Sequence, residues 1–368
     1  MKSNQTNDTA ASGMKTEAFD YHLPEELIAQ SPAIPRESCR LLVLHRSDMQ
    51  IEHKVFTSIL DYLNEGDLLV VNDTKVMPAR LLGHKENSTT EAEILLLHRL
   101  PQRDGNDPAA QQHWEALVKP GKRLKPGSRI NFDGLYAEIV DWAAEVDGKG
   151  RRIIRLTATD AASIDTALES LGRLPLPPYI KDYTGDTSYY QTVYARAQNS
   201  AAAPTAGLHF SEELLSKACA KGCTVATVCL EIGLDTFRKV DEEYISDHTI
   251  HSEVYTIEEE TVQAVAAAKK RGGRVIAVGT TAVRALESAS DAEGGIRTVC
   301  QEQTQLYITP GYQFKTVDAL LTNFHTPRST LLMLVSAFTG YDTMMKAYEQ
   351  ALENRYRFLS FGDAMLIV

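Results

Sequence analysis

The sequence predicts an α/β protein whose discontinuous, barrel-like α/β main domain is interrupted by a small antiparallel β-barrel domain. Helical periodicity alternates with short apolar runs over 18–77 and 158–368, a pattern typical of helices packed on a sheet. Between 78 and 157 this pattern gives way to β-rich runs separated by Gly, Pro, Asn and Asp, which favours an inserted antiparallel barrel. Residues 1–17 are small and polar, so we expect a disordered tail.

The first part of the main domain is predicted to supply two helices and two strands. Pro24–Gln30 and Phe56–Leu63 have helical character, whereas Leu41–His45 and Leu68–Asn72 are apolar runs of strand length. The inserted domain is then predicted from five β-rich runs: Ala92–His98, Trp114–Val118, Arg129–Phe132, Tyr136–Val140 and Arg152–Leu156. A helix near Ser163 follows, and the proline-stiffened Leu174–Ile180 leads back to the main domain.

The second half repeats one pattern three times, in which a polar loop leads into a helix and strands lie between the helices. The predicted elements are a helix from Ser211 to Lys221, a strand Thr224–Leu230, a helix Glu258–Arg271, a strand Arg274–Val278, a helix from Thr280, a strand Ala319–Phe324 and a helix from Ser329 or Thr330. Loops at strand ends are where such folds build sites.

The absence of several motifs, the short apolar stretches and the scattered cysteines disfavour several classes of protein. The motifs GxGxxG, GxxxxGK[ST], HExxH and GxSxG are absent, which disfavours dinucleotide, P-loop and serine-hydrolase chemistry. The longest strongly apolar stretch, Leu331–Phe338, is far too short to cross a bilayer, so we expect no membrane association. Five scattered cysteines indicate a reducing compartment, and we expect a cytoplasmic protein. Cys219 and Cys223 lack a second pair, so we expect no metal site.

The net charge of -11 argues against general affinity for polyanions, so any contact with nucleic acid must be local. One basic run contains five cations and no acidic residue: Lys119, Lys122, Arg123, Lys125 and Arg129. A solvated loop and a phosphate-binding loop explain this run equally well.

Three polar segments are the main candidates for a site. Ala202–Phe210 (AAPTAGLHF) places Thr205, Gly207 and His209 before a helix, where free amides and a titratable ring can meet a ligand. The competing interpretation is a loop with a packed histidine ring.

The other two segments follow strands. In Val278–Arg284 (VGTTAVR), Gly279 permits close approach to the backbone, Thr280 or Thr281 caps a helix, and Arg284 can hold a carboxylate; plain capping explains the threonines alone. Leu321–Thr330 (LTNFHTPRST) adds Asn323 and His325, and a capped helix is its structural alternative.

Further polar residues lie near strand ends. His248, His251 and Glu253 have a spacing that suits metal binding, but we favour a hydrogen-bonding or base role. Asp73, Lys75 and Arg80 are additional candidates, for which solvation is the alternative.

Segments in order along the chain resemble the family of S-adenosylmethionine:tRNA ribosyltransferase-isomerases. The resemblance rests on FDYHLPEELIAQSPAIPRESCRLLVL, VNDTKVMPARLLG, YQTVYAR, AAPTAGLHF, VIAVGTTAVRALES, LLTNFH and YRFLSFGDAMLI, and it extends from Phe19 to the C-terminus. It implies transfer of the ribosyl group of S-adenosylmethionine to 7-aminomethyl-7-deazaguanine in the tRNA anticodon, with isomerisation to epoxyqueuosine and release of adenine and methionine. S-adenosylmethionine is then a co-substrate, and no cofactor is expected.

The resemblance also implies roles for the candidate residues. His209 or His325 becomes the general acid or base, with Asn323 and Thr281 orienting the substrate and Arg284 holding the methionine carboxylate. The basic run becomes a contact for the anticodon arm, and we expect a monomer. The chain departs from the family pattern at Glu231, Asp235, Ser188 and Tyr189.

Two other functions remain possible on the sequence. One is an RNA-binding or assembly protein without catalysis, and the other is an enzyme that consumes S-adenosylmethionine while acting on a small molecule. Release of adenine with tRNA, compared with the free base, separates these functions.

Overall fold

The computed structural model describes residues 13–101, 109–143, 150–159, 163–181, 183–233, 236 and 238–368, without the side chains of 197–199. The described residues form two compact units. The α/β unit takes the described parts of Met1–Lys75, Pro177–Ala197 and Ala203–Val368, and the barrel unit takes Val76–Leu176 and Gln198–Ala202. The barrel unit therefore extends to Leu176, whereas the sequence placed the domain boundary at 157.

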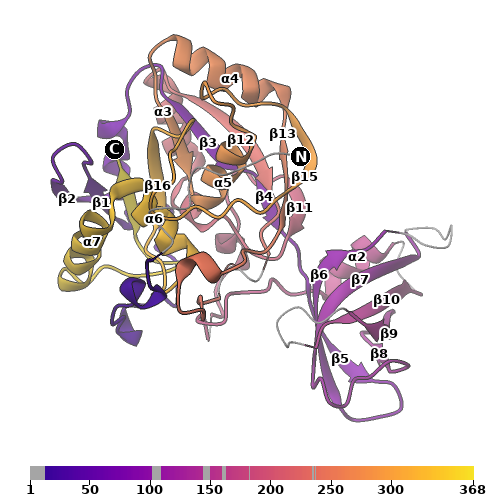
Figure 1. Cartoon of the computed structure of the whole chain (residues 1–368). Helices are drawn as coiled ribbons and strands as arrows, with labels where there is room; N and C mark the ends of the chain where they lie inside the picture. The colour runs from indigo at the N-terminus through magenta and orange to yellow at the C-terminus, as the bar shows by residue number, and fades with distance from the viewer. Residues whose placement is uncertain are drawn as a thin grey trace. The chain divides into compact units, whose positions relative to one another are not determined.

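The α/β unit is built on a nine-stranded mixed sheet with the order β15-β13-β12-β3-β14-β16-β17-β1-β2 (Figure 1). Its strands are β1 Arg40–Leu44, β2 Ile51–Val55, β3 Leu68–Asn72, β12 Thr224–Leu230, β13 Glu253–Ile257, β14 Val275–Val278, β15 Val299–Thr304, β16 Ala319–Asn323 and β17 Ala364–Ile367. The α/β class is confirmed. Within the described residues the sheet has two edges, β15 and β2, so an open sheet corrects the barrel-like form expected of this domain.

The central strands β12, β3, β14 and β16 run parallel to one another. All five residues of β3 and all four of β14 are buried, which explains why both read as continuous apolar runs rather than alternating ones. Val71, Val278 and Leu321 belong to one buried cluster that joins these strands. This arrangement brings the carboxyl ends of the parallel strands to one edge of the sheet.

The helices of the α/β unit are α3 Glu212–Ala220, α4 Glu259–Lys270, α5 Thr280–Ala289, α6 Thr330–Thr339 and α7 Tyr341–Glu353. Ser211 caps α3 by accepting from Leu214 N at 3.2 Å, and Ser329 caps α6 by accepting from Leu332 N at 3.2 Å. The predicted starts of these helices are confirmed.

Two predicted helices are shorter and tighter than expected. Pro24–Gln30 contains only the 3₁₀ turn η2 (Glu25–Leu27), and Phe56–Leu63 forms the 3₁₀ helix η4 (Phe56–Tyr62). Such short segments cannot offset the cost of nucleating an α-helix, so tertiary packing of Phe56 decides the geometry.

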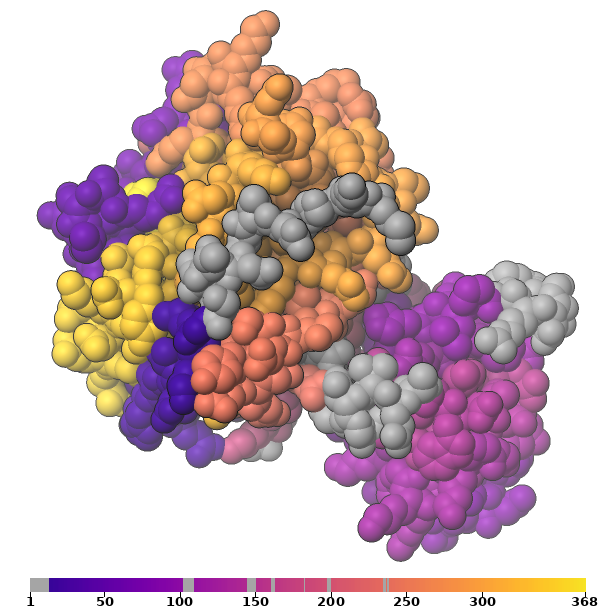
Figure 2. Space-filling model, viewed as in Figure 1, coloured from indigo at the N-terminus to yellow at the C-terminus, as the bar shows by residue number. Residues whose placement is uncertain are grey.

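The start of the described chain packs on the α/β unit and is not a free tail. Thr16 opens the 3₁₀ turn η1 (Thr16–Phe19) and is 1% exposed. Phe19 meets Tyr341 of α7 edge to face at 5.7 Å between ring centroids, and Tyr341 Oη donates to the carbonyl of Ala18 at 2.7 Å. Figure 2 shows these indigo and yellow segments on one surface. The predicted disordered tail of residues 1–17 is therefore wrong for Thr16 and Glu17, while 1–12 lie outside the described residues.

The barrel unit is a closed antiparallel barrel with the order β10-β7-β6-β5-β8-β9 (Figure 1), which confirms the inserted barrel. Its elements are β5 Arg80–Lys85, β6 Glu91–Arg99, β7 Gln111–Lys119, β8 Arg129–Asn131, β9 Leu135–Trp142, β10 Arg152–Ala158 and α2 Ile164–Leu171. The sequence missed β5, whose interior holds Gly83. A Cβ on Gly83 would lie 2.3 Å from the carbonyl oxygen of Asn131, so only glycine permits the approach of β8.

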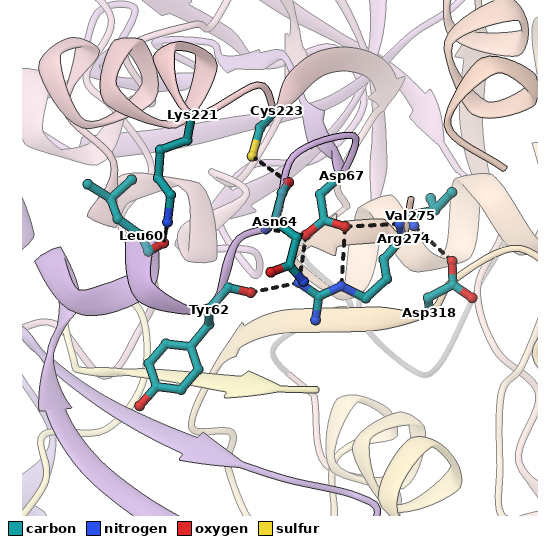
Figure 3. Close-up of polar contacts among 9 residues, drawn as sticks. All are labelled: Leu60, Tyr62, Asn64, Asp67, Lys221, Cys223, Arg274, Val275 and Asp318. Atoms are coloured by element: carbon teal, nitrogen blue, oxygen red, sulfur yellow. Dashed lines mark hydrogen bonds and ion pairs between the residues drawn. The ribbon is translucent and has the colours of Figure 1, made fainter. Parts of the chain in front are cut away.

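At the opposite edge of the main sheet, where the parallel strands begin, the buried Asp67 forms an ion pair with the half-buried Arg274 (Figure 3). Asp67 Oδ2 accepts from Arg274 Nη2 at 2.6 Å and from Asn64 N at 2.9 Å, and Oδ1 accepts from Arg274 N at 3.0 Å. Burial alone raises the pKa of Asp67, but these hydrogen bonds outweigh it and lower the pKa below its usual value. The group joins the start of β3 to the start of β14.

We expect Asp67→Asn to lower the free energy of unfolding by about 2 kcal/mol, because it removes charge-assisted bonds and faces an amide donor toward Arg274. Turnover should stay unchanged, since Asp67 lies at the far edge of the sheet from the candidate site. Urea unfolding measures the change, with the exposed Asp61→Asn as control. Equal stability of the two variants would contradict the structural role.

Candidate active site at the carboxyl edge of the sheet

Polar residues gather where the parallel strands of the main sheet end. Asn72 ends β3, Asn323 ends β16 and Gly279 follows β14, and these strands are parallel neighbours. Asn72 ties the edge to β12, because its Nδ2 donates to the carbonyl of Leu230 at 3.0 Å and its Oδ1 accepts from Leu230 N at 3.1 Å. These two hydrogen bonds hold the carboxyl ends of β3 and β12 together.

His209 is the centre of a buried hydrogen-bonded group. It ends the 3₁₀ helix η6 (Thr205–His209) and is 3% exposed. Its Nε2 lies 3.1 Å from Asn323 Nδ2, and its Nδ1 lies 3.2 Å from Cys39 Sγ. Thr205 Oγ1 donates to Asn323 Oδ1 at 2.9 Å. Three residues singled out in the sequence, His209, Asn323 and Thr205, therefore form one group.

These contacts determine which imidazole nitrogen carries the proton. Asn323 Nδ2 also donates to the carbonyl of Leu359 at 3.3 Å, which fixes the orientation of the amide. His209 Nε2 therefore accepts, and Nδ1 carries the proton and faces Cys39 Sγ. Leu359 has a left-handed φ of 70°, a costly conformation for a branched residue, and it places its carbonyl against the Asn323 amide.

His325 belongs to a second group. Its Nε2 lies 3.3 Å from Thr322 Oγ1, its Nδ1 lies 3.4 Å from Tyr348 Oη, and its backbone carbonyl accepts from Tyr21 Oη. The ring is 8% exposed. The two predicted catalytic histidines are thus not joined by a direct hydrogen bond, and only His209 contacts Asn323.

Both rings are neutral at physiological pH. Burial, followed by the positive charges of Arg357 and Arg36, lowers the pKa of His209 to about 3. Burial alone lowers the pKa of His325 to about 3. A neutral imidazole offers one donor and one acceptor, so either ring can receive a proton if its acceptor nitrogen is released.

We expect acid to destabilise the fold through these rings. Their folded pKa values are lowered, so the stability they contribute is complete above about pH 6.5, the usual histidine pKa, and is lost as pH falls toward 3. The slope should reach about 1.4 kcal/mol per pH unit for each ring. Urea unfolding between pH 6.5 and 5 measures it. His325→Gln should flatten the slope and the exposed His98→Gln should not; an unchanged slope in His325→Gln would be contrary to this expectation.

Gly207 lies against two hydroxyl-bearing side chains from the segment before η6. A Cβ on Gly207 would lie 1.9 Å from Tyr194 Oη and 2.9 Å from Thr192 Cγ2, so glycine is required for close approach. The hydroxyls of Tyr194 and Thr192 are buried and have no hydrogen-bond partner among the described residues. Buried hydroxyls normally have partners, so these two can serve a polar ligand.

The start of α5 presents further unpartnered groups. Gly279 has a φ of 93°, which favours glycine, and Thr280 and Thr281 open the helix at 7% and 8% exposure. The first amides of a helix have no partner within it. Thr281 Oγ1 also lacks a hydrogen-bond partner among the described residues, so capping does not explain this threonine.

Arg284, one turn into α5, is already paired. Its Nη1 donates to Glu253 Oε2, and its Nε donates to the carbonyl of Leu306 at 3.2 Å. Glu253 Oε1 lies 3.1 Å from His251 Nε2 and accepts from Gly233 N at 3.2 Å. Burial alone raises the pKa of Glu253, but the charge of Arg284, the contact with His251 and the hydrogen bond from Gly233 together outweigh it and lower the pKa. Arg284 Nη2 has no partner among the described residues and is the one nitrogen left for a ligand.

A small cavity, open to solvent, lies beside His209 within the α/β unit. It is lined by Pro32, Ala33, Arg36, Tyr189, Leu208, His209, Ser360, Phe361 and Gly362. Arg36 lies 4.9 Å above the Tyr189 ring and donates to the carbonyl of Ser188 at 2.9 Å. One departure from the family pattern, Tyr189, thus lines the cavity, and another, Ser188, contacts Arg36, while Asp235 is outside the described residues.

Other predicted residues have partners of their own outside this group. Asp73 Oδ2 accepts from Arg196 Nε at 3.0 Å, and burial raises the pKa of Asp73 against the opposing charge of Arg196. Lys75 lies in β4 (Thr74–Val76), which pairs with β11 (Ala197–Ser200). Arg80 belongs to the barrel unit, where it pairs with Glu93 at 2.8 Å.

The five cations of the basic run lie on the barrel unit and are exposed: Lys119, Lys122, Arg123, Lys125 and Arg129. The buried Leu124 anchors the run in the barrel core. Arg129 lies 3.6 Å from Glu86, a weak exposed pair. The other four cations form no ion pair with the described acidic residues, so we treat Lys119–Arg129, the basic loop, as a cationic surface.

The two histidines of the HTIHSE segment contact different carboxylates. His248 Nδ1 lies 3.0 Å from Glu242, whereas His251 faces Glu253. Across the described ranges no three His, Cys, Asp or Glu side chains are grouped as metal ligands, and no helix in them is long and apolar enough to span a bilayer.

Sequence reasoning missed Cys39 and Tyr194 as members of the site. Cys39 was counted only as a scattered cysteine, and Tyr194 lies in YQTVYAR, a segment that supports the resemblance but has no obvious catalytic side chain. The aromatic and small residues of that segment were the available signal.

The chain is similar to proteins of one family over almost its whole length. The chain matches the family model described as queuosine biosynthesis protein over residues 16–367. S-adenosylmethionine:tRNA ribosyltransferase-isomerases of Symbiobacterium thermophilum and Caldanaerobacter subterraneus are 49% and 48% identical over 96% of this chain and 100% of their own. The crystal structure of S-adenosylmethionine tRNA ribosyltransferase from Thermotoga maritima is 38% identical, with a TM-score of 0.51 over 95% of this chain and 100% of that chain. The chain belongs to the queuosine biosynthesis family, that of the S-adenosylmethionine:tRNA ribosyltransferase-isomerases.

Proposed function

We propose that this chain transfers the ribosyl group of S-adenosylmethionine to 7-aminomethyl-7-deazaguanine in tRNA and isomerises it to epoxyqueuosine, releasing adenine and methionine. Family membership supports the class of reaction. The structural observation that carries the proposal is the carboxyl edge of the sheet, where the His209–Asn323–Thr205 group and the start of α5 offer unpartnered or exchangeable polar atoms.

The start of α5 suits the methionine carboxylate of S-adenosylmethionine. Thr281 Oγ1 and Arg284 Nη2 are buried without partners in the described chain, and the first-turn amides add donors. Glu253 holds the guanidinium in place, so Arg284 acts with one free nitrogen rather than as a bidentate clamp. Gly279 leaves room above the backbone, since a Cβ there would touch only Ala206 Cβ and Thr281 Oγ1, each at 3.6 Å.

His209 is the better placed of the two histidines for proton transfer. It lines the cavity and contacts Asn323, whereas His325 is enclosed by Thr322 and Tyr348. The sulfonium of S-adenosylmethionine acidifies the ribose 5′ carbon, and a neutral imidazole accepts the proton. Before His209 Nε2 can accept that proton, its hydrogen bond from Asn323 Nδ2 must break. Asn323 therefore orients the ring first and the substrate afterwards.

The basic loop of the barrel unit is proposed to contact the tRNA anticodon arm. We expect the triple variant Lys122→Glu, Arg123→Glu and Lys125→Glu to weaken tRNA binding and to reduce the slope of log Kd against log salt by about 0.7–0.9 for each phosphate that is no longer neutralised. A filter-binding titration over a range of salt concentrations measures both. Lys217→Glu on α3 reverses an exposed charge elsewhere and should leave the slope unchanged. An unaltered slope in the triple variant would remove the loop from the tRNA interface.

We further propose the following properties for the enzyme. S-adenosylmethionine is consumed as a co-substrate, and the reaction needs no resident cofactor or metal. The enzyme acts as a monomer in the cytoplasm, where its tRNA substrate is found.

Adenine release tests the activity. Purified protein is incubated with S-adenosylmethionine and tRNA that carries the aminomethyl precursor, and adenine is measured by chromatography. The proposal predicts adenine release only when both substrates are present. No release would favour a non-catalytic RNA-binding protein, and release with the free base alone would favour an enzyme that acts on a small molecule.

A further inference from the structure

The two tryptophans of the chain lie in opposite environments, both in the barrel unit. Trp114 is 4% exposed in the barrel core, and its Nε1 donates to Gln112 Oε1 at 3.0 Å. Trp142, the last residue of β9, is 50% exposed. Packing inside the barrel therefore accounts for the first indole and leaves the second unexplained.

Arg152 holds the Trp142 indole from one side. The guanidinium carbon lies 3.5 Å from the ring centroid, and Arg152 itself is 2% exposed. Its Nη2 donates to the carbonyl of Gly121 at 3.2 Å and its Nε to the carbonyl of Leu124 at 3.4 Å. A buried arginine thus covers the ring from one side, and half of the Trp142 side chain remains exposed. The ring is oriented before any ligand arrives.

The same contacts join Trp142 to the basic loop. Gly121 and Leu124 are members of that loop, and the exposed Lys122, Arg123 and Lys125 alternate with them. An aromatic face beside a cationic groove is the arrangement that binds single-stranded nucleic acid: the base stacks on the ring and its phosphates meet the cations. The net charge of -11 opposes general binding of polyanions, so binding depends on this local surface. The surface suits a partner that is anionic and also has flat rings.

We propose that Trp142 is a stacking platform for an unpaired base of the RNA substrate, with the neighbouring phosphates on the basic loop. The identity of the RNA as tRNA rests on the proposed function. The platform belongs to the barrel unit, and the base that it is proposed to bind is not the one modified.

Tryptophan fluorescence tests this directly, because each tryptophan can be isolated. Trp114→Phe leaves Trp142 as the only emitter, and Trp142→Phe leaves Trp114. The probes are tRNA, a short unstructured RNA, and heparin, which is polyanionic but has no bases. The proposal predicts that both RNAs quench Trp142 and that heparin does not, while Trp114 stays unchanged with every probe. Equal quenching by heparin and RNA, or none by RNA, would overturn it.

Affinity gives the second arm. Trp142→Ala should weaken tRNA binding about 5- to 150-fold, the range that one stacked base supplies, and Trp142→Phe should restore part of it. The salt slope should stay as in the wild type, because no cation is removed. Unchanged affinity in Trp142→Ala would contradict the platform even if adenine release were normal. Conversely, quenching by tRNA without adenine release would overturn the proposed function and leave the platform standing.

Discussion

His209→Ala is expected to lower kcat by about 10²–10⁴-fold, the range that a positioned acid or base supplies. The physical reason is that His209 is the neutral ring that lines the cavity, with its acceptor nitrogen held by Asn323 and its proton directed at Cys39 Sγ. Adenine release under single-turnover conditions, with both substrates saturating, measures the chemical step. KM for S-adenosylmethionine should change far less than kcat.

Three variants make this result interpretable. His209→Gln keeps a polar side chain in the cavity but cannot take the proton, so it should be as inactive as His209→Ala. His325→Ala should lose less activity, because His325 lies in the Thr322–Tyr348 group. His98→Ala on the barrel surface is the neutral control. Near-normal turnover in both His209 and His325 variants would end the assignment of a histidine acid or base, and thermal unfolding checks that each variant is folded.

Glu253→Gln is expected to lower the free energy of unfolding by about 3–5 kcal/mol, because the change leaves a buried guanidinium without its counter-charge. Glu253 is 3% exposed and Arg284 5% exposed. Arg284 would also lose its fixed position, and KM for S-adenosylmethionine should rise with kcat less affected, because its Nη2 is proposed to bind the methionine carboxylate. Urea unfolding and initial rates measure the two effects.

An exposed pair is the matched control. Arg297 and Glu302 are 54% and 47% exposed. Glu302→Gln should therefore cost less than about 1 kcal/mol. The double variant Glu253→Gln, Arg284→Met should recover much of the stability, since neither charge remains buried. It should not recover the low KM. A double variant as unstable as Glu253→Gln alone would show that the destabilisation comes from packing and not from the unpaired charge.

The sequence predicted the central part of the fold well because its signals are local and strong. The continuous apolar run of β3 predicts a buried strand, and the serine caps of α3 and α6 predict where these helices start. The elements that it missed depend on distant contacts. Gly83 interrupts the apolar pattern of β5, so the sequence did not indicate a strand there. The close approach of the Asn131 backbone, which requires this glycine, is visible only in the folded barrel. The 3₁₀ geometry of Phe56–Tyr62 is likewise set by packing.

The site was predictable as a set of segments but not as a set of contacts. Thr205, His209 and Asn323 lie in motifs that stand out in the sequence, and parallel strand order brings the ends of β14 and β16 to one edge. The partner of Arg284 was not predictable, because Glu253 is on β13, which is antiparallel to its neighbour β12 and reaches this edge from the opposite direction. For the same reason the role of Cys39 beside His209 could not be inferred from spacing.

The mass of the modified nucleoside shows whether the ribose carbons of S-adenosylmethionine reach the tRNA. Precursor tRNA is incubated with S-adenosylmethionine labelled with ¹³C throughout its ribose, digested, and analysed by mass spectrometry. The account predicts an epoxyqueuosine nucleoside that carries every labelled ribose carbon in the wild type and in Asp67→Asn, and its absence in His209→Ala. Unlabelled product, or full product in His209→Ala, would contradict it.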